Sequence, residues 1–407
     1  MVPEGWKHGF VKDLANTVMG YAFKSTDFVP DGIPLLRMGN LYQNMLDLER
    51  NPVFLPKRYL SDFSRFIVRP GDLVMSMTGT MGKRDYGFTV QIPDSVPELL
   101  LNQRVMKFEP KKDACLEYLL NLFRSEIFLN YLYSFPGGTK QANLSAKQVQ
   151  VLPVLIPPKA EQKKIAKILS TWDKAITTTE QLLTNSQQQK KALMQQLLTG
   201  EKRLAGFKQA WSKVKVSKMG SISSGGTPDT TKKEYWDGGI NWLTPTDVTS
   251  LKSRYVFSTN KTISEKGLKN SSAKMLPRGA LLICTRATIG AMAISTTEIA
   301  TNQGFKNLVP NAEFSVEFLY YLFTFNVKEL VRRSSGSTFL ELSKSDFEKL
   351  TFLCPCLDEQ HKIASVLIAA DDEVSVQQQK LNNLKQEKKA LMQQLLTGKR
   401  RVKVEAA

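Results

Sequence analysis

Cysteine and histidine are scarce in this chain, and their scarcity excludes several classes of protein. The 407 residues include four cysteines and two histidines. Four scattered cysteines are too few for a disulfide scaffold, so we expect a protein of the reducing cytoplasm. Cys354 and Cys356 precede His361, but the paired spacing of a zinc site is missing. We therefore expect no metal ligands in this chain.

Long apolar runs are also missing, and charge of one sign prevails. No run reaches the roughly 18 apolar residues of a membrane-spanning helix, and residues 1–6 lack the apolar stretch of a secretion signal. The chain has 56 Lys and Arg against 38 Asp and Glu, a formal net charge of +18. This balance favours a nucleic acid as partner, because cations that bind phosphates release condensed counterions. A basic surface without a partner is the alternative.

Three segments resemble catalytic or cofactor-binding motifs, but each of them lacks a required part. Residues 51–54 resemble the Asn-Pro-Pro-Phe loop of amino-methyltransferases, but Val53 replaces the second proline and no glycine-rich methyl-donor site precedes them. Residues 79–83 end like a phosphate-binding loop, yet Arg84 stands where Ser or Thr is required. Residues 224–228 are rich in glycine without a dinucleotide fingerprint. We predict a chain that recognises rather than reacts, with no catalytic residues.

Two long segments of the chain are repeats of one another. Residues 190–200 return unchanged as residues 388–398, and residues 161–166 return with one difference 198 positions later. Apolar residues in both copies recur in alternating steps of four and three, which is the heptad pattern of a coiled coil. We therefore predict long helices at 159–200 and 357–398, each ending at a glycine.

The order of segments predicts that these two helices pair antiparallel. The first helix leaves one globular segment toward the next, and the second helix runs back. Lys190 and Lys388 interrupt the apolar seam, so they should help to define the register or mark where a partner docks. A helix from Glu161 to Thr199 extends roughly 58 Å at about 1.5 Å per residue, which matches roughly 17 base pairs of duplex DNA. Surface helices packed only on their own domains are the alternative.

The two globular segments are loosely related to each other. Trp6 matches Trp211, residues 71–76 match 279–284, and residues 102–103 match 302–303. Apolar positions persist while polar positions differ, which indicates one α+β fold with two contact surfaces. The predicted organisation is a globular domain at 1–158, a helix at 159–200, a linker at 201–209, a globular domain at 210–356, a helix at 357–398 and a basic tail at 399–407.

Together these motifs resemble the specificity subunit of a bacterial type I restriction-modification system. The repeated helix ends in Leu193–Gly200, and the second half adds Ser224–Pro228, Gly239–Pro245 and Gly336–Thr338. The first half departs from the pattern: it lacks Gly-Gly-Thr-Pro and has Gly137–Thr139 in place of the last motif. The resemblance covers essentially the whole chain.

The resemblance implies an α+β chain in which two homologous target-recognition domains are separated by a pair of long antiparallel coiled-coil helices, in a pseudo-twofold arrangement. Each domain would read one half of a bipartite, asymmetric site in double-stranded DNA. The helices would set the spacing and dock two modification subunits, which carry S-adenosylmethionine and methylate adenine. Restriction subunits with ATP, Mg²⁺, translocase and nuclease activity would join them, so this chain itself would hold no cofactor. A free-standing two-headed DNA-binding scaffold and a single-chain methyltransferase or nuclease are the alternatives.

Candidate DNA contacts are polar residues in turns where the two halves align. Arg, Lys, Asn, Gln, Ser and Thr read base edges, and Arg and Lys also bind phosphates. The candidates in the first half are Arg37, Asn40, Thr78, Thr80, Lys83, Arg84, Gln103, Arg104, Thr139, Lys140 and Gln141. Those in the second half are Thr244, Thr246, Asp247, Thr285, Arg286, Thr288, Gln303, Lys306, Ser335, Ser337 and Thr338.

Overall fold

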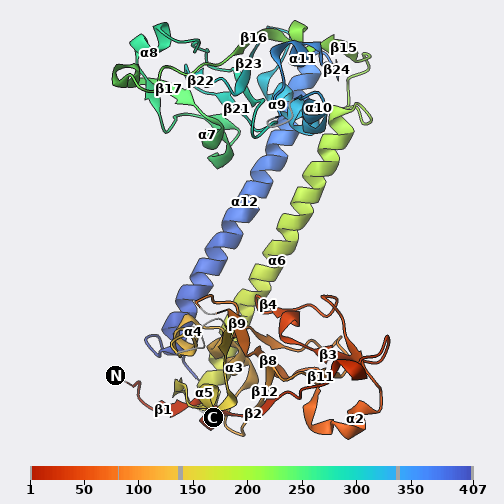
Figure 1. Cartoon of the computed structure of the whole chain (residues 1–407), viewed down its shortest axis with the longest axis vertical. Coiled ribbons are helices and arrows are strands. Elements are labelled where there is room, and N and C mark those ends of the chain that lie inside the picture. Colours follow the sequence, from red (N-terminus) through yellow and green to blue (C-terminus); the bar gives the residue numbers. More distant parts are fainter. Residues whose placement is uncertain (1, 81, 136–140, 336–339, 405–407) are drawn as a thin grey trace. The chain divides into compact units, whose positions relative to one another are not determined.

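The computed structural model describes residues 2–80, 82–135, 141–335 and 340–404 (Figure 1). The chain forms two compact units, each of which takes a part of both long helices. The first unit comprises residues 1–180 and 379–407, and the second comprises residues 181–378. Each unit therefore contains a globular α+β part and its own stretch of helix pair.

The first unit is built around a four-stranded antiparallel sheet in the order β10-β8-β12-β2. A second sheet, β6-β3-β11-β7, is mixed. The strands are β1 Lys7–Phe10, β2 Ala15–Met19, β3 Ile33–Leu36, β4 Leu41–Tyr42, β5 Met45–Leu46, β6 Phe54–Leu55, β7 Ile67–Val68, β8 Leu73–Ser76, β9 Thr78–Thr80, β10 Thr89–Gln91, β11 Leu99–Leu101, β12 Val105–Pro110, β13 Gln141–Asn143 and β14 Pro153–Ile156. The helices of its globular part are α1 Val11–Leu14, α2 Tyr59–Asp62, α3 Leu116–Phe123, α4 Glu126–Tyr133 and α5 Ala146–Gln150, with 3₁₀ turns η1 Ser25–Asp27, η2 Met38–Asn40 and η3 Ser64–Phe66.

The second unit repeats this plan with one strand more in its main sheet, β16-β23-β20-β21-β18, beside a smaller sheet, β19-β17-β22. Its strands are β15 Ser212–Lys215, β16 Gly220–Ser224, β17 Trp236–Leu243, β18 Tyr255–Val256, β19 Thr262–Ile263, β20 Leu281–Cys284, β21 Met292–Ser295, β22 Ala300–Thr301, β23 Phe305–Pro310 and β24 Thr351–Cys354. Its helices are α7 Pro245–Ser250, α8 Glu265–Lys269, α9 Val316–Phe325, α10 Val327–Arg332 and α11 Lys344–Lys349, with 3₁₀ turns η4 Val216–Lys218 and η5 Lys233–Tyr235.

The predicted relation between the two globular segments is confirmed by their sheets. The order β10-β8-β12-β2 of the first unit corresponds to β21-β20-β23-β16 of the second, with antiparallel pairing throughout both sets of four. The buried positions agree as well, since β8 and β20 are each buried over all four residues. One α+β fold therefore occurs twice in this chain.

The long helices are α6, Lys159–Leu198, and α12, Leu357–Leu396, and they run side by side within each unit (Figure 1). In the first unit Lys388 binds Asp173 at 2.5 Å, and Lys385 binds Glu180 at 2.7 Å. A later residue of α6 thus pairs with an earlier residue of α12, so the helices are antiparallel, as predicted. No helix within the described residues is both long enough and apolar enough to cross a membrane.

The ends of the helices belong to the cores of the globular parts. In the first unit the start of α6, with Ile165 and Leu169, shares one buried cluster with Phe123 and Leu395. In the second unit Ile363, at the start of α12, is buried in the same way with Leu197 from the end of α6. Burying a leucine contributes about 2 kcal/mol, so these contacts attach the helix pair firmly to each globular part.

The repeated Glu-Gln motif explains why both helices begin alike. The amide of Gln162 accepts a hydrogen bond from the backbone of Cys115 and donates to the carbonyls of Asp113 and Pro157. Gln360 makes the corresponding three contacts in the second unit, with Ser315, Glu313 and Pro355. A buried amide with all these partners satisfies both itself and the backbone around the helix start.

The linker and the basic tail have the same structural role. Glu161, on α6, accepts hydrogen bonds from the Trp6 indole and from Arg401 of the tail, whose Nη2 lies 2.6 Å away. Glu359, on α12, accepts from the Trp211 indole and from Arg203 of the linker, with Nη2 at 2.7 Å. Both glutamates are buried, so these cations and indoles compensate the cost of removing a carboxylate from water.

Candidate nucleic-acid interface

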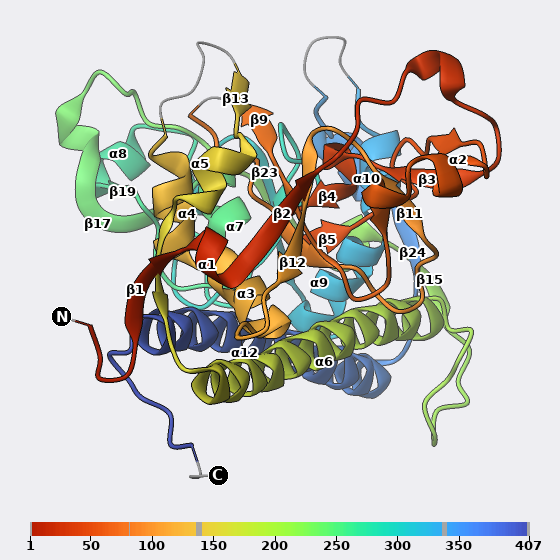
Figure 2. The same cartoon turned by 90° about the horizontal axis from the view of Figure 1, so that it is seen from below.

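In the first unit, backbone hydrogen bonds gather the turns that carry the candidate residues. Asn102 donates to the carbonyl of Leu36 at 3.1 Å, which places the turn at 102–104 beside Arg37. Met77 donates to Arg104 at 3.0 Å, so the start of β9 lies beside the same turn. β9 and β13 are side by side (Figure 2), with Gln141 opposite Thr80. These three segments meet at one edge of the unit.

The second unit gathers its turns through equivalent contacts. Asn302 donates to the carbonyl of Leu243 at 3.0 Å, and Thr285 donates to Gly304 at 2.8 Å. Leu342 donates to Thr285 at 2.9 Å, and Ser335 and Glu341 donate to each other's carbonyls, which adds these residues to the group. The sequence alignment of the two halves therefore identified turns that are also neighbours in space.

A glycine stands at the same place in both units, although the first half lacks the Gly-Gly-Thr-Pro motif. A Cβ on Gly225 would lie 2.0 Å from the carbonyl oxygen of Asn302, and one on Gly20 would lie 2.0 Å from that of Asn102. Only glycine permits this approach of two backbones. Gly20 is thus the counterpart of Gly225, and the departure of the first half from the motif leaves the turn intact.

Most candidates are accessible at these edges. Arg37 and Thr244 are partly exposed, and each stands at the N-cap of a short helical turn. The exposed candidates are Thr80, Lys83, Arg84, Gln103, Arg104, Gln141, Thr246, Arg286, Thr288, Gln303 and Ser335. Their DNA contacts stay a prediction. Thr139, Lys140, Ser337 and Thr338 lie outside the described residues.

Two candidates are buried because they shape the turns from inside. Asn40 is 3% exposed, and its amide donates to the carbonyls of Asp47 and Arg50 while its oxygen accepts from the backbone of Arg37. Asp247 is 7% exposed and accepts four hydrogen bonds, two from Thr244 and two from Asn260. Their polar atoms are occupied by these partners, and DNA contact by either residue stays a prediction.

Three further candidates are buried in or beside the sheets. Thr78 donates to Asn143 at 2.8 Å, and Thr285 donates to the carbonyl of Gly304 at 3.2 Å. Lys306 is 5% exposed and lies 3.6 Å from a carboxylate oxygen of Glu341. These contacts hold the three side chains inside their units, and DNA contact by any of them stays a prediction.

Arg84 is exposed but already has partners. It lies 2.9 Å from Glu126 and 2.8 Å from Asn130, and its guanidinium covers the ring of Tyr133. An exposed ion pair contributes only about 0–1 kcal/mol. Arg84 can therefore exchange this pair for a phosphate at little cost.

The sequence did not reveal a hairpin that rises beside the candidate turn of the first unit. Its strands β4 and β5 are joined by Gln43 and Asn44, which have positive φ angles of 52° and 62°. Tyr42 and Met45, on either side, are 47% and 63% exposed. An asparagine in a two-residue turn is the available signal, but the usual glycine after it is missing. The tip itself contacts β10 and Arg124, through Asn44.

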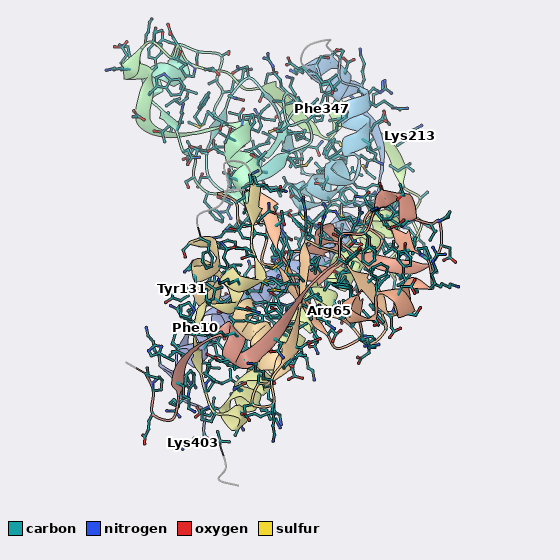
Figure 3. All side chains as sticks on the ribbon, turned by 60° about the horizontal axis from the view of Figure 1, so that its bottom comes forward. Phe10, Arg65, Tyr131, Lys213, Phe347 and Lys403 are labelled. Carbon is teal, nitrogen blue, oxygen red and sulfur yellow. The ribbon has the colours of Figure 1, made fainter. Side chains whose placement is uncertain are left out.

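Positive charge is spread over the surface of both units. Arg65, Lys213 and Lys403 are examples whose side chains extend from the ribbon (Figure 3). Such cations suit phosphates of either strand and carry no sequence information, whereas the polar turns offer donors and acceptors for base edges. The two units therefore define a protein with two related but unequal recognition surfaces.

The comparisons with known proteins identify the family of the chain. A sequence model of the type I restriction modification DNA specificity domain matches residues 3–185 and again residues 208–386. The chain belongs to this family, with two copies of the domain. Its relatives are named as specificity subunits, so the family places the chain among recognition components rather than catalysts.

Two relatives from Methanocaldococcus jannaschii illustrate the match. The specificity subunit of the type I restriction enzyme MjaIX is 40% identical over 164 residues, which are 40% of this chain and 38% of that protein. The first match thus spans well under half of that relative. The putative MjaX specificity subunit is 24% identical over 421 residues, which cover 99% of this chain and 95% of that protein.

Solved structures show the same fold over the whole chain. The type I S subunit of M. genitalium has a TM-score of 0.60 at 14% identity, with 96% of each chain covered. A chain from a study of complex assembly and conformational transition of the type I R-M system also has a TM-score of 0.60, at 17% identity, with 97% of this chain and 98% of that chain covered.

Proposed function

We propose that this chain directs a type I restriction-modification complex to a bipartite, asymmetric DNA site, with each unit reading one half. One observation carries the proposal: equivalent turns of the two units hold different side chains. Arg37 corresponds to Thr244, and Arg104 to Gly304. Base identity is read by donor and acceptor patterns, so two surfaces with one fold and different side chains suit two unlike half-sites.

Two modification subunits would bind the repeated helices. Residues 190–200 and 388–398 are identical, so the chain offers the same eleven-residue surface twice, which suits two copies of one partner. In the first unit a groove lies between α6, α12 and the tail, lined in part by Ile168, Trp172 and Leu391. Half-buried apolar side chains of this kind are typical anchors of protein interfaces.

The chemistry would belong to the partners. S-adenosylmethionine is expected on the modification subunits, and ATP and Mg²⁺ on the restriction subunits. This chain would act in the cytoplasm, where its target DNA lies, and would supply recognition and spacing.

The experiment is a map of methylated adenines after the chain is expressed with and without its modification subunit. A split motif that appears only when both chains are present supports the proposal and reveals both half-sites. Methylation by this chain alone contradicts it. Absence of methylation with a modification subunit shown to bind the methyl donor also contradicts it, and favours a free-standing DNA-binding scaffold.

A further inference from the structure

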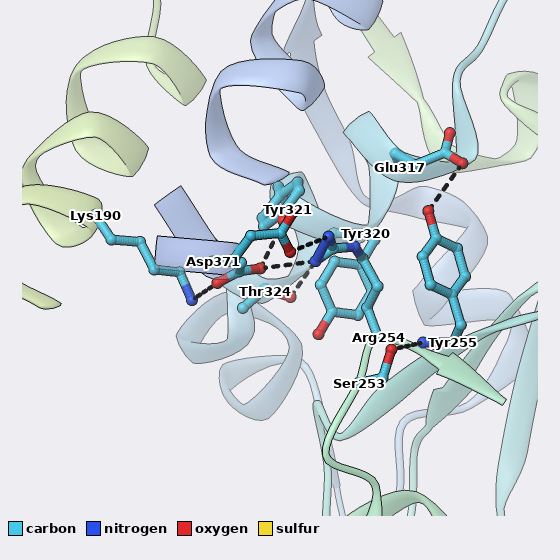
Figure 4. Close-up of polar contacts among 10 residues, drawn as sticks. Lys190, Ser253, Arg254, Tyr255, Glu317, Tyr320, Tyr321, Thr324 and Asp371 are labelled. Atoms are coloured by element: carbon cyan, nitrogen blue, oxygen red, sulfur yellow. Dashed lines mark hydrogen bonds and ion pairs between the residues drawn. The ribbon is translucent and has the colours of Figure 1, made fainter. Parts of the chain in front are cut away.

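In the second unit, three elements meet at the carboxylate of Asp371 on α12 (Figure 4). Lys190 of α6 lies 2.5 Å from one oxygen of this carboxylate. The hydroxyl of Tyr321 on α9 donates to the other oxygen at 2.6 Å, and Arg254 lies 3.3 Å from the same oxygen. Asp371 thus joins both helices of the pair to the globular part.

Arg254 is held at this point by more than one contact. Its second terminal nitrogen lies 3.4 Å from Asp372, and its guanidinium lies 5.4 Å from the centre of the Tyr255 ring. The side chain is only 10% exposed, and its Nε is buried with no partner among the described residues. Arginine suits this place because its planar, rigid guanidinium presents separate terminal nitrogens to the two carboxylates in a fixed geometry.

The backbone of Arg254 connects this contact to the main sheet. Its carbonyl accepts a hydrogen bond from Ile294 of β21 at 2.8 Å, and β18 begins at the next residue. The same segment follows directly from α7, whose N-cap Thr244 is a candidate for base contact. One residue therefore ties the helix pair to the sheet and to the segment that leaves the reading turn.

The first unit repeats the lysine-aspartate pair, but the arginine near this pair comes from a different element. Lys388 binds Asp173 at 2.5 Å, and both residues lie 198 positions from Lys190 and Asp371. Arg124, at the end of α3, lines the same cavity as Lys388. Its guanidinium donates to the carbonyls of Thr89 on β10 and Asn44 in the hairpin, at 2.8 and 3.0 Å.

The two arginines come from different elements and make different contacts. Both are partly buried: Arg254 contacts the carboxylate of Asp371, whereas Arg124 lines a cavity with Lys388 and donates to the carbonyl of Asn44. Burial lowers the pKa of Arg124, while the negative charge of Asp173 opposes that change.

We propose that Arg254 is a positioning residue that holds the second recognition unit in one orientation on its stretch of the helix pair, and so restricts the spacing between half-sites that the protein accepts. The claim about half-site spacing rests on the proposed function. The claim about orientation concerns one unit by itself and is tested without DNA.

The first test measures orientation within the second unit of the full chain. Spin labels are placed by Gln188→Cys on α6 and Lys269→Cys on α8, both exposed, in a Cys356→Ser background that removes the exposed native thiol. Arg254→Gln and Asp371→Asn should each broaden the distance distribution, and Arg254→Lys should broaden it less. Lys252→Gln, an exposed residue of the same loop, is the matched control and should leave the width unchanged.

Unchanged widths in both Arg254→Gln and Asp371→Asn would overturn the inference. Asp371→Asn keeps the shape of the side chain and Arg254→Lys keeps the charge, so at least one variant should fold. Far-ultraviolet circular dichroism of each variant establishes that it does.

The second test measures methylation with the modification subunit at sites whose spacer is one base pair shorter or longer than the preferred one. Arg254→Gln should raise methylation of these sites several-fold relative to the preferred site, whereas Lys252→Gln should not. If Arg254 contributed to stability alone, Arg254→Gln would lower methylation of all sites by the same factor. That result would contradict the claim about spacing. If the wild-type chain directs no methylation, the proposed function fails, while the distance measurement still decides the orientation.

Discussion

The two units share one fold but have different residues and elements at their edges. In the second unit the main sheet gains β18 as a fifth strand, whereas the first unit places the exposed hairpin β4–β5 against β10. Inside, the pattern is constant: the helix starts, the Glu-Gln motif and the tryptophan beside it all recur. The comparison shows that packing and buried hydrogen bonds restrict the interior, while the edges were free to diverge.

The largest expected effect comes from matched leucines in the two cores. Leu169 and Leu367 lie one repeat apart and are both fully buried. Replacing either with alanine leaves a cavity, which should cost about 3 kcal/mol of unfolding free energy in its own unit. Pulsed alkylation in urea reports the units separately, because Cys115 is buried in the first and Cys284 in the second.

Burial raises the pKa of Cys284 to about 12, so this thiol should react only after the second unit opens. Leu367→Ala should lower the urea midpoint for Cys284, and Leu169→Ala that for Cys115. If each variant shifted both thiols equally, the chain would unfold as one cooperative body, and the division into two units would not describe its stability.

Replacing the two buried glutamates should lower the free energy of unfolding by different amounts in the two units. Glu359→Gln breaks a pair in which the carboxylate side chain is 1% exposed and Arg203 is 27% exposed, so it should cost the second unit about 3 kcal/mol. In the first unit the values are 8% for Glu161 and 41% for Arg401, and water screens that pair more. Glu161→Gln should therefore cost about 2 kcal/mol.

The same alkylation assay measures both glutamate variants, with Glu265→Gln, on an exposed face of α8, as the control. A larger loss for Glu161→Gln than for Glu359→Gln would show that exposure does not govern the strength of these pairs.

The recognition surfaces should differ in which half-site they read. Arg286→Ala should weaken binding to the specific site by about 1–3 kcal/mol if the guanidinium contacts a guanine, and should relax specificity in one half-site only. Arg104→Ala should affect the other half-site. Binding titrations with DNA altered in one half at a time measure this, and Arg65→Ala, outside the turns, is the control.

Equal losses on specific and random DNA would assign Arg286 to phosphate contact. A change of specificity in the same half-site for Arg286→Ala and Arg104→Ala would contradict the assignment of one unit to each half.

The smallest expected effect is a dependence on pH confined to the first unit. The hydrogen bond from Lys389, assisted by Arg84, holds the pKa of Glu126 below its ordinary value. A carboxyl with a lowered pKa contributes stability above its unfolded pKa, and this contribution is lost as the pH falls through the folded value. Because the side chain is 47% exposed, the contribution should stay below about 1 kcal/mol.

Urea unfolding followed at Cys115 across acidic pH measures this contribution, with Glu126→Gln as the comparison. The difference between wild type and variant should shrink as the pH falls below the ordinary glutamate value. A difference that is constant over this range would show that the charge of Glu126 contributes nothing.

Some of what the sequence analysis missed was available in the sequence. Thr244-Pro245-Thr246-Asp247 is a capping box with proline at the first helical position, which predicts that Asp247 turns inward onto the backbone. Lys306 lies in β23, whose first four residues are all buried between β16 and β20, so its burial follows from the place of the strand in the sheet. Arg254 offered no such signal, because a lone arginine in a loop says nothing about a partner 117 residues away.

The sequence by itself determined the repeats, the helix starts and the matched turns of the two halves, because each depends on local periodicity or on residues a few positions apart. Only the tertiary structure decided which polar turn residues face inward, that the tail serves Glu161 as the linker serves Glu359, and that Arg254 contacts Asp371. Arg401 and Glu161 are 240 positions apart. Such contacts form only in the tertiary structure, and no local sequence pattern predicts them.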